Sequence, residues 1–181
     1  MHKASDEELL LRIAAGDARA FSELAPRYAA RAIALARRIT KSDADAEEVV
    51  QEAFLRVWVN APRWRPHAAF RTWFYRIVFN LALNRRRRAP FLALDEAGDP
   101  PDPAPGAGER MQRDERDRLL EAAIAELPER QRAAIVLTYG EELPNAEAAA
   151  VLGTSVAGME SLLVRAKRAL REKLGPYFDE T

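Results

Sequence analysis

The sequence predicts an all-α protein built from two small helical domains that are joined by a proline-rich, acidic linker. Apolar residues recur at helical spacing in both halves of the chain, and strand-like alternation is not sustained in any segment. Between the halves, residues 89–108 hold five prolines and three glycines, a composition that excludes a continuous helix or strand. We therefore expect one domain over residues 1–88, a flexible linker over 89–110 and a second domain over 111–181.

The first domain is expected to begin with two helices. Ser5 followed by Glu8 fits a capping box at the start of the segment "LLLRIAAG", and Gly16 fits the end of that helix. A second helix is predicted over "ARAFSELAPRYAARAIALARRIT". Pro26 lies inside this segment, and we expect a kink or a break there.

A third helix, "AEEVVQEAFLRVWVN", is expected to be capped by Ser42-Asp43 or by Asp45. One of its faces is apolar at helical spacing and consists of Val50, Phe54, Val57 and Trp58. The opposite face carries Glu48, Gln51, Glu52 and Leu55. The segment "APRWRP" that follows has two prolines and is expected to be a loop.

The fourth helix is predicted over "FRTWFYRIVFNLALNRRRR", residues 70–88, which holds five aromatics and six arginines without one acid. Its core-facing residues are expected to be Phe70, Trp73, Phe74, Ile77, Val78 and Leu81. Off that stripe lie Arg71, Tyr75, Arg76, Phe79, Asn80, Asn84 and Arg87, and the preceding loop adds Arg63, Trp64 and Arg65.

Arginines bind phosphates, exposed aromatics stack on unpaired bases, and asparagines bond base edges. This combination favours contact with a nucleic-acid strand that is single or is being opened. The alternative is a solvated basic face on an ordinary packed helix.

The segment "LPNAEAAAVLGTSVAGMESLLVRAKRALREKL" in the second domain predicts a helix-turn-helix. Ala149 is small where two helices cross, Gly153 suits a left-handed turn, and Met159 packs back on the first helix. Leu152, Val156 and Leu163 are expected to complete this small core, and Ser155 to cap the second helix.

That second helix, residues 156–173, is a candidate recognition helix for the DNA major groove. Its exposed N-terminal residues are expected to be Ala157, Gly158, Glu160 and Ser161, and Arg165, Lys167, Arg168 and Arg171 suit phosphates. The preceding helix, "LPERQRAAIVLTY", has Pro128 in its first turn. Its Arg130 and Arg132 are expected to reach the DNA backbone or to be solvated.

Charge is distributed as these two candidate surfaces require, although the net charge is zero. Residues 61–88 hold eight arginines and no acid, and residues 160–175 hold five bases against two acids. The four acids of residues 89–108 separate the two blocks. A protein that binds nucleic acid needs a local positive surface rather than a positive total.

The composition excludes several other classes of protein. The chain has 181 residues, of which 48% are hydrophobic, no cysteine and two histidines. A disulfide framework is therefore excluded, and donors for the usual zinc sites are lacking; we expect no metal and no cofactor. No run of about 18 apolar residues exists, and the N-terminus lacks the apolar region of a secretory signal. We expect a cytoplasmic protein without membrane insertion.

The two halves together resemble the bacterial sigma factors of the extracytoplasmic-function (ECF) group, group IV, which are small two-domain relatives of sigma-70. The resemblance is carried by "DADAEEVVQEAFLRVW", "FRTWFYRIVFNLALNRRRR", "LPERQRAAIVL" and the helix-turn-helix, in that order, with the proline-rich linker between the second and the third. Each motif alone is weak. Their order and spacing over roughly residues 6–175 make the resemblance specific.

The resemblance implies that residues 1–88 are sigma region 2 and residues 111–181 are region 4. Core RNA polymerase would then be the partner, contacted at the β′ clamp helices and the β flap, and promoter DNA the second partner. The residues that carry over to the clamp contact are Glu48, Gln51, Glu52 and Leu55. The −10 element would be captured by Arg63, Trp64, Arg65, Arg71, Tyr75, Arg76, Asn80 and Asn84.

The resemblance also places the −35 contact on the recognition helix, at Ser155, Ala157, Gly158, Glu160, Ser161, Arg165, Lys167 and Arg168. Trp73 and Phe74 stand where sigma-70 factors have adjacent aromatics near the melting fork, although their spacing directs both to the core. The linker would run through the polymerase, and an anti-sigma factor would hold the protein inactive.

One segment departs from the family pattern. Typical members have Thr-Val-Lys-Ser-Arg-Leu or similar in the recognition helix, whereas this chain has "GMESLL" at residues 158–163. The usual −35 consensus therefore does not transfer. The segments "NAEAAAVLG" and "ESLL" resemble a subset of the group that includes metal-responsive members.

Three rival functions are weighed on the sequence alone. A structural helical adaptor would need no basic block, so the arginine-rich helix counts against it. A helix-turn-helix regulator that acts without polymerase explains the second domain equally well, but it leaves the aromatic and arginine-rich helix unexplained. An enzyme would need a catalytic constellation. Glu47, Glu48 and Glu52 form an ordinary charged helix face, His2 and His67 have no ligand partner, and no glycine-rich phosphate loop exists. We expect a protein that is not an enzyme.

Overall fold

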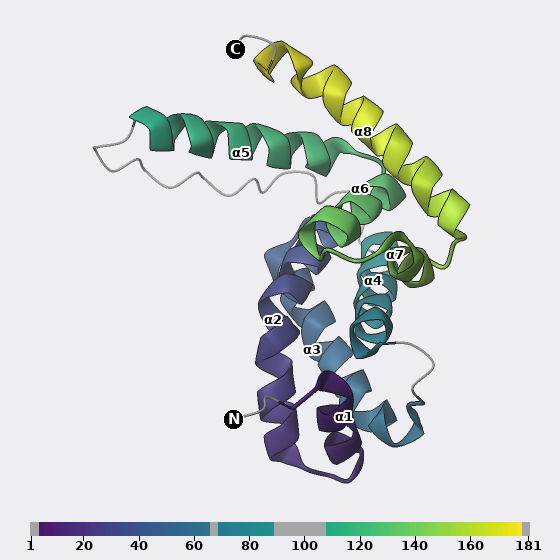
Figure 1. Cartoon of the computed structure of the whole chain (residues 1–181). Coiled ribbons are helices and arrows are strands. Elements are labelled where there is room, and N and C mark those ends of the chain that lie inside the picture. Colours follow the sequence, from purple (N-terminus) through teal and green to yellow (C-terminus); the bar gives the residue numbers. More distant parts are fainter. Residues whose placement is uncertain (1–3, 66–68, 89–107, 179–181) are drawn as a thin grey trace.

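The computed structural model describes residues 4–65, 69–88 and 108–178, and these are helical with no strand among them (Figure 1). The predicted all-α class is confirmed. The first half contains α1 (Asp6–Ala14), α2 (Ala18–Thr40), α3 (Asp43–Asn60), the short 3-10 turn η1 (Ala61–Arg63) and α4 (Phe70–Arg88). The second half contains α5 (Gly108–Glu126), α6 (Glu129–Ile135), the π turn η2 (Val136–Gly140), α7 (Asn145–Leu152) and α8 (Val156–Phe178).

Local signals set the ends of the first helices as the sequence predicts. The Ser5 hydroxyl accepts a bond from the Glu8 amide at 3.1 Å, and the Glu8 carboxylate accepts one from the Ser5 amide at 2.7 Å, which is a complete capping box. Gly16 follows α1 with a φ of 87°. Ser42, rather than Asp43 or Asp45, caps α3, because its hydroxyl accepts from the Asp45 amide at 3.2 Å.

Two segments differ from expectation. Pro26 does not break the second helix, which runs from Ala18 to Thr40. The segment predicted as one helix before the helix-turn-helix is divided between α6 and η2, and Pro128 precedes α6 as its cap residue. Most of the expected linker, residues 89–107, lies outside the described residues, and α5 begins at Gly108, inside the range expected for the linker.

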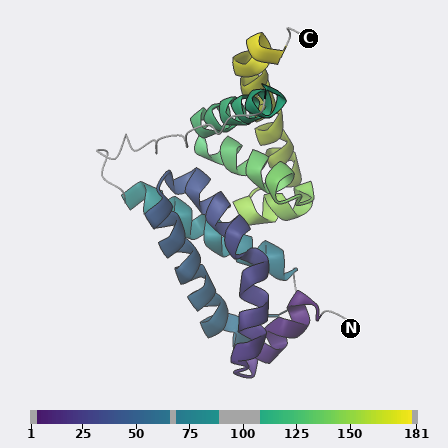
Figure 2. The ribbon, with the colours of Figure 1, turned by 90° about the vertical axis from the view of Figure 1, so that its left-hand side faces the viewer.

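The core of the first half is formed by α2, α3 and α4, with α1 across one end (Figures 1 and 2). Phe70 and Phe74 of α4 are fully buried and stack with their ring centroids 5.7 Å apart. Tyr28 of α2 meets both rings edge-on, and Phe54 of α3 lies 4.9 Å from Phe74. Each aromatic side chain of this size buries about 150–250 Å², so this cluster contributes strongly to the stability of the first half.

The core of the second half is formed where α6, α7 and α8 meet. Met159 is fully buried, and Ala149, Leu152 and Leu163 are buried with it, as the helix-turn-helix prediction requires. Val156 was expected in this core but is 44% exposed, because it occupies the first residue of α8 at the turn.

The two halves pack against each other through α6 and α7, which lie on α2 and α4 (Figures 1 and 2). Arg132 of α6 was expected at the surface, yet it is buried at this junction. Its guanidinium donates to the carbonyl oxygens of Arg38 in α2, at 2.5 Å, and Leu127, at 2.8 Å. Burial lowers the pKa of Arg132.

Among the described residues, no single helix is long and apolar enough to cross a membrane. One helix pair, Asn145–Leu152 with Val156–Gly175, passes that test by length and composition, with a 95° bend between its members.

Candidate nucleic-acid interfaces

Helix α4 presents three different faces. The first, with Phe70, Phe74 and Val78, is buried in the first half of the molecule. The second, with Arg76, Asn80 and Asn84 at intervals of four residues, is exposed to solvent. The third, with Arg71, Tyr75 and Phe79, faces the second half. The residues predicted for strand binding are thus divided between an exposed face and a covered face.

The exposed face of α4 carries two cations, Arg76 and Arg87, and the two amides of Asn80 and Asn84. Two further cations, Arg63 and Arg65, are exposed in the η1 segment (η1 and the two residues after it, 61–65), where Trp64 is half-buried against the core. Residues 66–68, between this segment and α4, lie outside the described residues.

Trp73 and Phe74 differ in exposure, although their spacing assigns both to the core. Phe74 is fully buried, so its ring is not available to a base. Trp73 is half-buried, with its ring edge-on to Phe70 at a centroid distance of 6.1 Å. Trp73 and Asn80 are seven residues apart, which is close to two full turns of an α-helix. Trp73 therefore lies next to the exposed face of α4 as well as to the core face.

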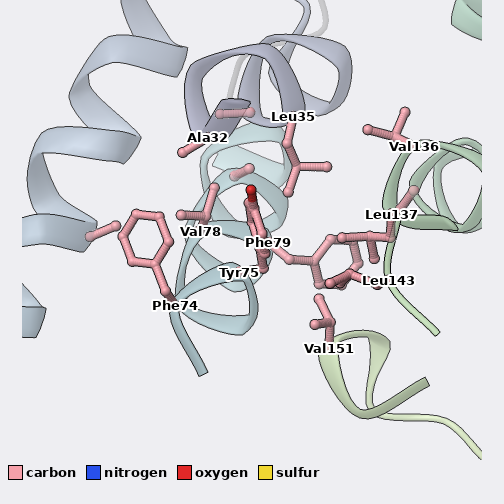
Figure 3. Close-up of a cluster of buried hydrophobic side chains, with 14 of the residues drawn as sticks. Ala32, Leu35, Phe74, Tyr75, Val78, Phe79, Val136, Leu137, Leu143 and Val151 are labelled. Carbon is pink, nitrogen blue, oxygen red and sulfur yellow. The ribbon is translucent and has the colours of Figure 1, made fainter. Parts of the chain in front are cut away.

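The predicted exposure of Tyr75 and Phe79 is wrong. Each side chain is 2% exposed. Figure 3 shows Phe79 pointing from α4 toward Leu137, Leu143 and Val151 of the second half. Helical spacing correctly separates these two rings from the core of the first half. It does not reveal that a second apolar surface covers them.

Arg71 and Tyr75 are held by carboxylates of the second half. Arg71 donates from Nε and Nη2 to the two carboxylate oxygens of Glu147, each at 2.8 Å, and the Thr72 hydroxyl donates to Glu147 at 2.8 Å. The Tyr75 hydroxyl donates to the Glu141 carboxylate. Arg71 lowers the pKa of Glu147, while burial and then Glu141 raise the pKa of Tyr75. The sequence gives no signal for these contacts, because Glu141 belongs to no motif and Glu147 is not singled out within the helix-turn-helix segment.

The candidate clamp-facing residues Glu48, Gln51, Glu52 and Leu55 lie together on the exposed face of α3. Arg85 of α4 donates to Asp45 at 2.8 Å and also to Glu48, and Glu52 pairs with Arg56 at 2.6 Å. The apolar part of this face is larger than predicted.

Three neighbours on the C-terminal half of α3 form that apolar part. Leu55 is 64% exposed, Val59 66%, and Trp58, which was expected in the core, 37%. Trp58 keeps one edge contact with Phe21 of α2, at a centroid distance of 5.6 Å. The spacing of 55, 58 and 59 places all three on one side of the helix.

The turn of the helix-turn-helix has the predicted geometry. Gly153 adopts a left-handed conformation with a φ of 60°, and the Thr154 amide donates to the Ala149 carbonyl at 3.0 Å. Ser155 caps α8, since its hydroxyl accepts from the Gly158 amide at 3.0 Å. A Cβ atom at Gly158 would lie 2.4 Å from the Thr154 hydroxyl, so the turn itself favours glycine there.

The candidate −35 residues lie on one accessible helix. Ala157, Glu160 and Ser161 are exposed near the start of α8, Gly158 is half-buried, and Arg165, Lys167 and Arg168 are exposed farther along. Arg165 donates to the Ser161 hydroxyl at 2.9 Å, and Arg168 to Glu172 at 2.9 Å. Lys167 lies 5.0 Å from the ring centroid of Tyr139.

Two family models match the two halves of the chain. Sigma-70 region 2 matches residues 24–90, and Sigma-70 region 4 matches residues 117–170. The ECF RNA polymerase sigma-E factor of Escherichia coli K12 is 32% identical, with 95% of each chain covered. This protein belongs to the ECF group of the sigma-70 family. The prediction drawn from the motifs is confirmed.

Two solved structures share the fold of this chain. The sigma factor's chain resembles CnrH, solved in complex with the cytosolic domain of CnrY, at a TM-score of 0.73 and 28% identity, over 96% of this chain and 99% of that one. It also shares the fold of RpoE from Bartonella quintana, solved with the anti-sigma factor NepR, at a TM-score of 0.69 and 18% identity, over 86% and 96% of the two chains.

The family matches coincide with the surfaces described above. The region 2 match includes all of α3 and α4 of the sigma factor, and the region 4 match includes α6 and α7 with most of α8. Among the described residues, no group of three or more metal-ligating side chains lies together. The resemblance to metal-responsive members stays a prediction.

Proposed function

We propose that this sigma factor binds core RNA polymerase, directs it to promoters with −10 and −35 elements, and supplies binding energy for strand opening. The observation that carries the proposal is the coincidence of the region 2 and region 4 matches with exposed polar and basic faces on α3, α4 and α8. The factor performs no chemical step in this proposal, because the polymerase forms the phosphodiester bonds.

The polymerase contact is assigned to the exposed face of α3. Glu48, Gln51 and Glu52 provide acceptors for cations of a clamp helix, and Leu55 with Val59 provides apolar area that binding would remove from water. Interfaces of this kind combine a few buried apolar anchors with a polar rim. The β′ clamp helices are the proposed partner surface, and the β flap is the proposed partner of region 4.

The −10 contact is assigned to the exposed face of α4 and the η1 segment. Arg63, Arg65 and Arg76 lie where they can neutralise phosphates, while Asn80 and Asn84 offer amides to base edges. Trp64 and Trp73 are half-buried and offer ring surface for stacking. Tyr75 belongs to the same proposed site but is covered by the second half, and Arg71, whose side chain is 39% exposed, is paired there with Glu147.

The −35 contact is assigned to α8. Ala157, Gly158, Glu160 and Ser161 would face base edges, and Arg165, Lys167 and Arg168 would hold phosphates. Ser155, which caps the helix, lies at its groove-facing end. A glutamate accepts from the cytosine amino group, so Glu160 favours a cytosine in the −35 element.

The factor is regulated by an anti-sigma partner in this proposal. The structural neighbours were solved with such partners or with a cytosolic partner domain. An anti-sigma factor would cover the α3 face and the DNA-binding faces at the same time.

The two region 2 assignments are separable by experiment. Glu52→Arg places a cation on the clamp-facing surface and is expected to weaken binding to core polymerase while leaving folding intact. Trp64→Ala with Asn80→Ala is expected to leave polymerase binding intact and to reduce permanganate reactivity of promoter thymines. Asp117→Arg is the control, because Asp117 is exposed on α5 and lies outside both surfaces. Equal loss of binding and opening in the second variant would contradict the assignment.

A further inference from the structure

The contact between the two halves occupies part of the proposed strand-binding site. The Glu147 carboxylate of α7 accepts hydrogen bonds from Nε and Nη2 of Arg71 and from the Thr72 hydroxyl. A planar guanidinium binds a carboxylate and a phosphate with the same paired geometry. Glu147 therefore sits where a phosphate of a promoter strand would be bound by Arg71.

The neighbouring loop supplies a second carboxylate. Glu141, which is buried, accepts from the Tyr75 hydroxyl, and Leu143, also buried, lies beside Phe79 (Figure 3). Glu142 between them has a φ of 53°, an unfavourable conformation for a residue with a side chain. This conformation allows Glu141 and Leu143 to face α4 together while Glu142 points to solvent.

The covered site opens into a basic cavity of about 190 Å³ between the halves. Arg27, Arg31 and Arg71 line it, together with Asp6 and Glu141. Arg27 is paired with Asp6 and Glu23, whereas Arg31 makes no ion pair with any described residue. The three arginines outnumber the two acids of the lining by one, and without Glu141 this excess would rise to two beside Tyr75, a combination suited to a phosphate and an adjoining base.

We propose that Glu141 and Glu147 form an interdomain latch that imitates strand phosphates and keeps Arg71 and Tyr75 from single-stranded DNA until the two halves separate. The inference rests on the proposed −10 role of α4. The competing ligand is the sugar-phosphate backbone of an unpaired strand. Opening the latch exposes the covered face of α4 next to the face that is already exposed.

The test removes the two latch charges and measures domain separation in the full chain. The latch variant is Glu141→Gln with Glu147→Gln. The control is Asp117→Asn with Glu142→Gln, which removes the same number of charges from exposed positions without a contact to α4. The chain has no cysteine, so Ser22→Cys and Glu172→Cys accept a fluorophore pair, one on each half. Energy transfer is expected to fall in the latch variant only.

The same proteins are then titrated with a labelled, mixed-sequence single strand of about 20 nucleotides, longer than a typical single-strand site. The latch variant is expected to bind at least about fivefold more tightly than wild type, the lower end of ordinary coupling between sites, and the control to bind like wild type. Unchanged energy transfer would overturn the latch. Lower transfer without tighter binding would overturn the masking of the site.

Transcription with core polymerase separates failure of this inference from failure of the proposed function. If wild type and both variants support promoter-specific transcripts but bind single strands equally, only the latch is wrong. If none of them supports transcripts, the proposed function is wrong.

Discussion

Phe79 provides the sharpest test of how the two halves are joined, because its ring is buried although it points away from the core of its own half (Figure 3). Truncating a buried phenylalanine to alanine costs about 3–5 kcal/mol. In Phe79→Ala we expect about 3 kcal/mol, the low end, because separation of the halves lets water fill the site. About 1.4 kcal/mol corresponds to a factor of ten, so docking would weaken by roughly 150-fold.

The assay compares Phe79→Ala with Phe74→Ala, a truncation of a ring that is fully buried inside the first half. Phe79→Ala is expected to increase the radius of gyration in small-angle scattering while the first half still unfolds cooperatively in urea. Phe74→Ala is expected to lower the urea midpoint of the first half. If Phe79→Ala left the radius unchanged and lowered that midpoint as much as Phe74→Ala, the reasoning would be refuted.

Three further predictions concern the turn, the buried arginine and pH. Gly153→Ala should lower the free energy of urea unfolding of the second half by about 1–2 kcal/mol, because a residue with a Cβ is strained at a φ of 60°. An unchanged free energy of unfolding would contradict this. Arg132→Ala should lower the free energy of unfolding by about 3 kcal/mol, because it leaves the Arg38 and Leu127 carbonyls without their donor. Denaturation of the full chain measures this loss. Arg130→Ala, at a less buried neighbour, is the comparison. Arg71 lowers the pKa of Glu147 from its ordinary value of 4.5. The contact therefore stabilises docking fully above about pH 4.5 and loses this contribution as the pH falls through the lowered pKa. Energy transfer between the halves should fall on acidification, and Glu147→Gln should lack that part of the change.

The sequence was sufficient for the features that depend on local chemistry. The capping box at Ser5, the caps at Ser42 and Ser155, and the left-handed Gly153 each follow from side chains within four residues of the helix end. The family also followed from motif order. The contact roles of individual residues on α3, α4 and α8 stay predictions.

The sequence was insufficient wherever one half decides the environment of the other. Helical spacing showed that Tyr75 and Phe79 lie off the core stripe, but only the packing of α7 and η2 shows that they are buried. The sequence indicates a surface cation at Arg132, whereas its burial depends on two carbonyl acceptors, Arg38 in α2 and Leu127 just after α5. Nothing local assigns a role to Glu141 or Glu147, because their partners on α4 are more than sixty residues away.

The most direct test of the central claim is multi-round transcription on a library of promoter-like fragments, with core RNA polymerase in the presence and absence of this protein. We expect fragment-specific transcripts that require both the polymerase and the sigma factor, and their shared −35 sequence would identify the bases that α8 contacts. Binding to duplex fragments without any polymerase-dependent transcript would contradict the account and would instead support a helix-turn-helix regulator that acts alone.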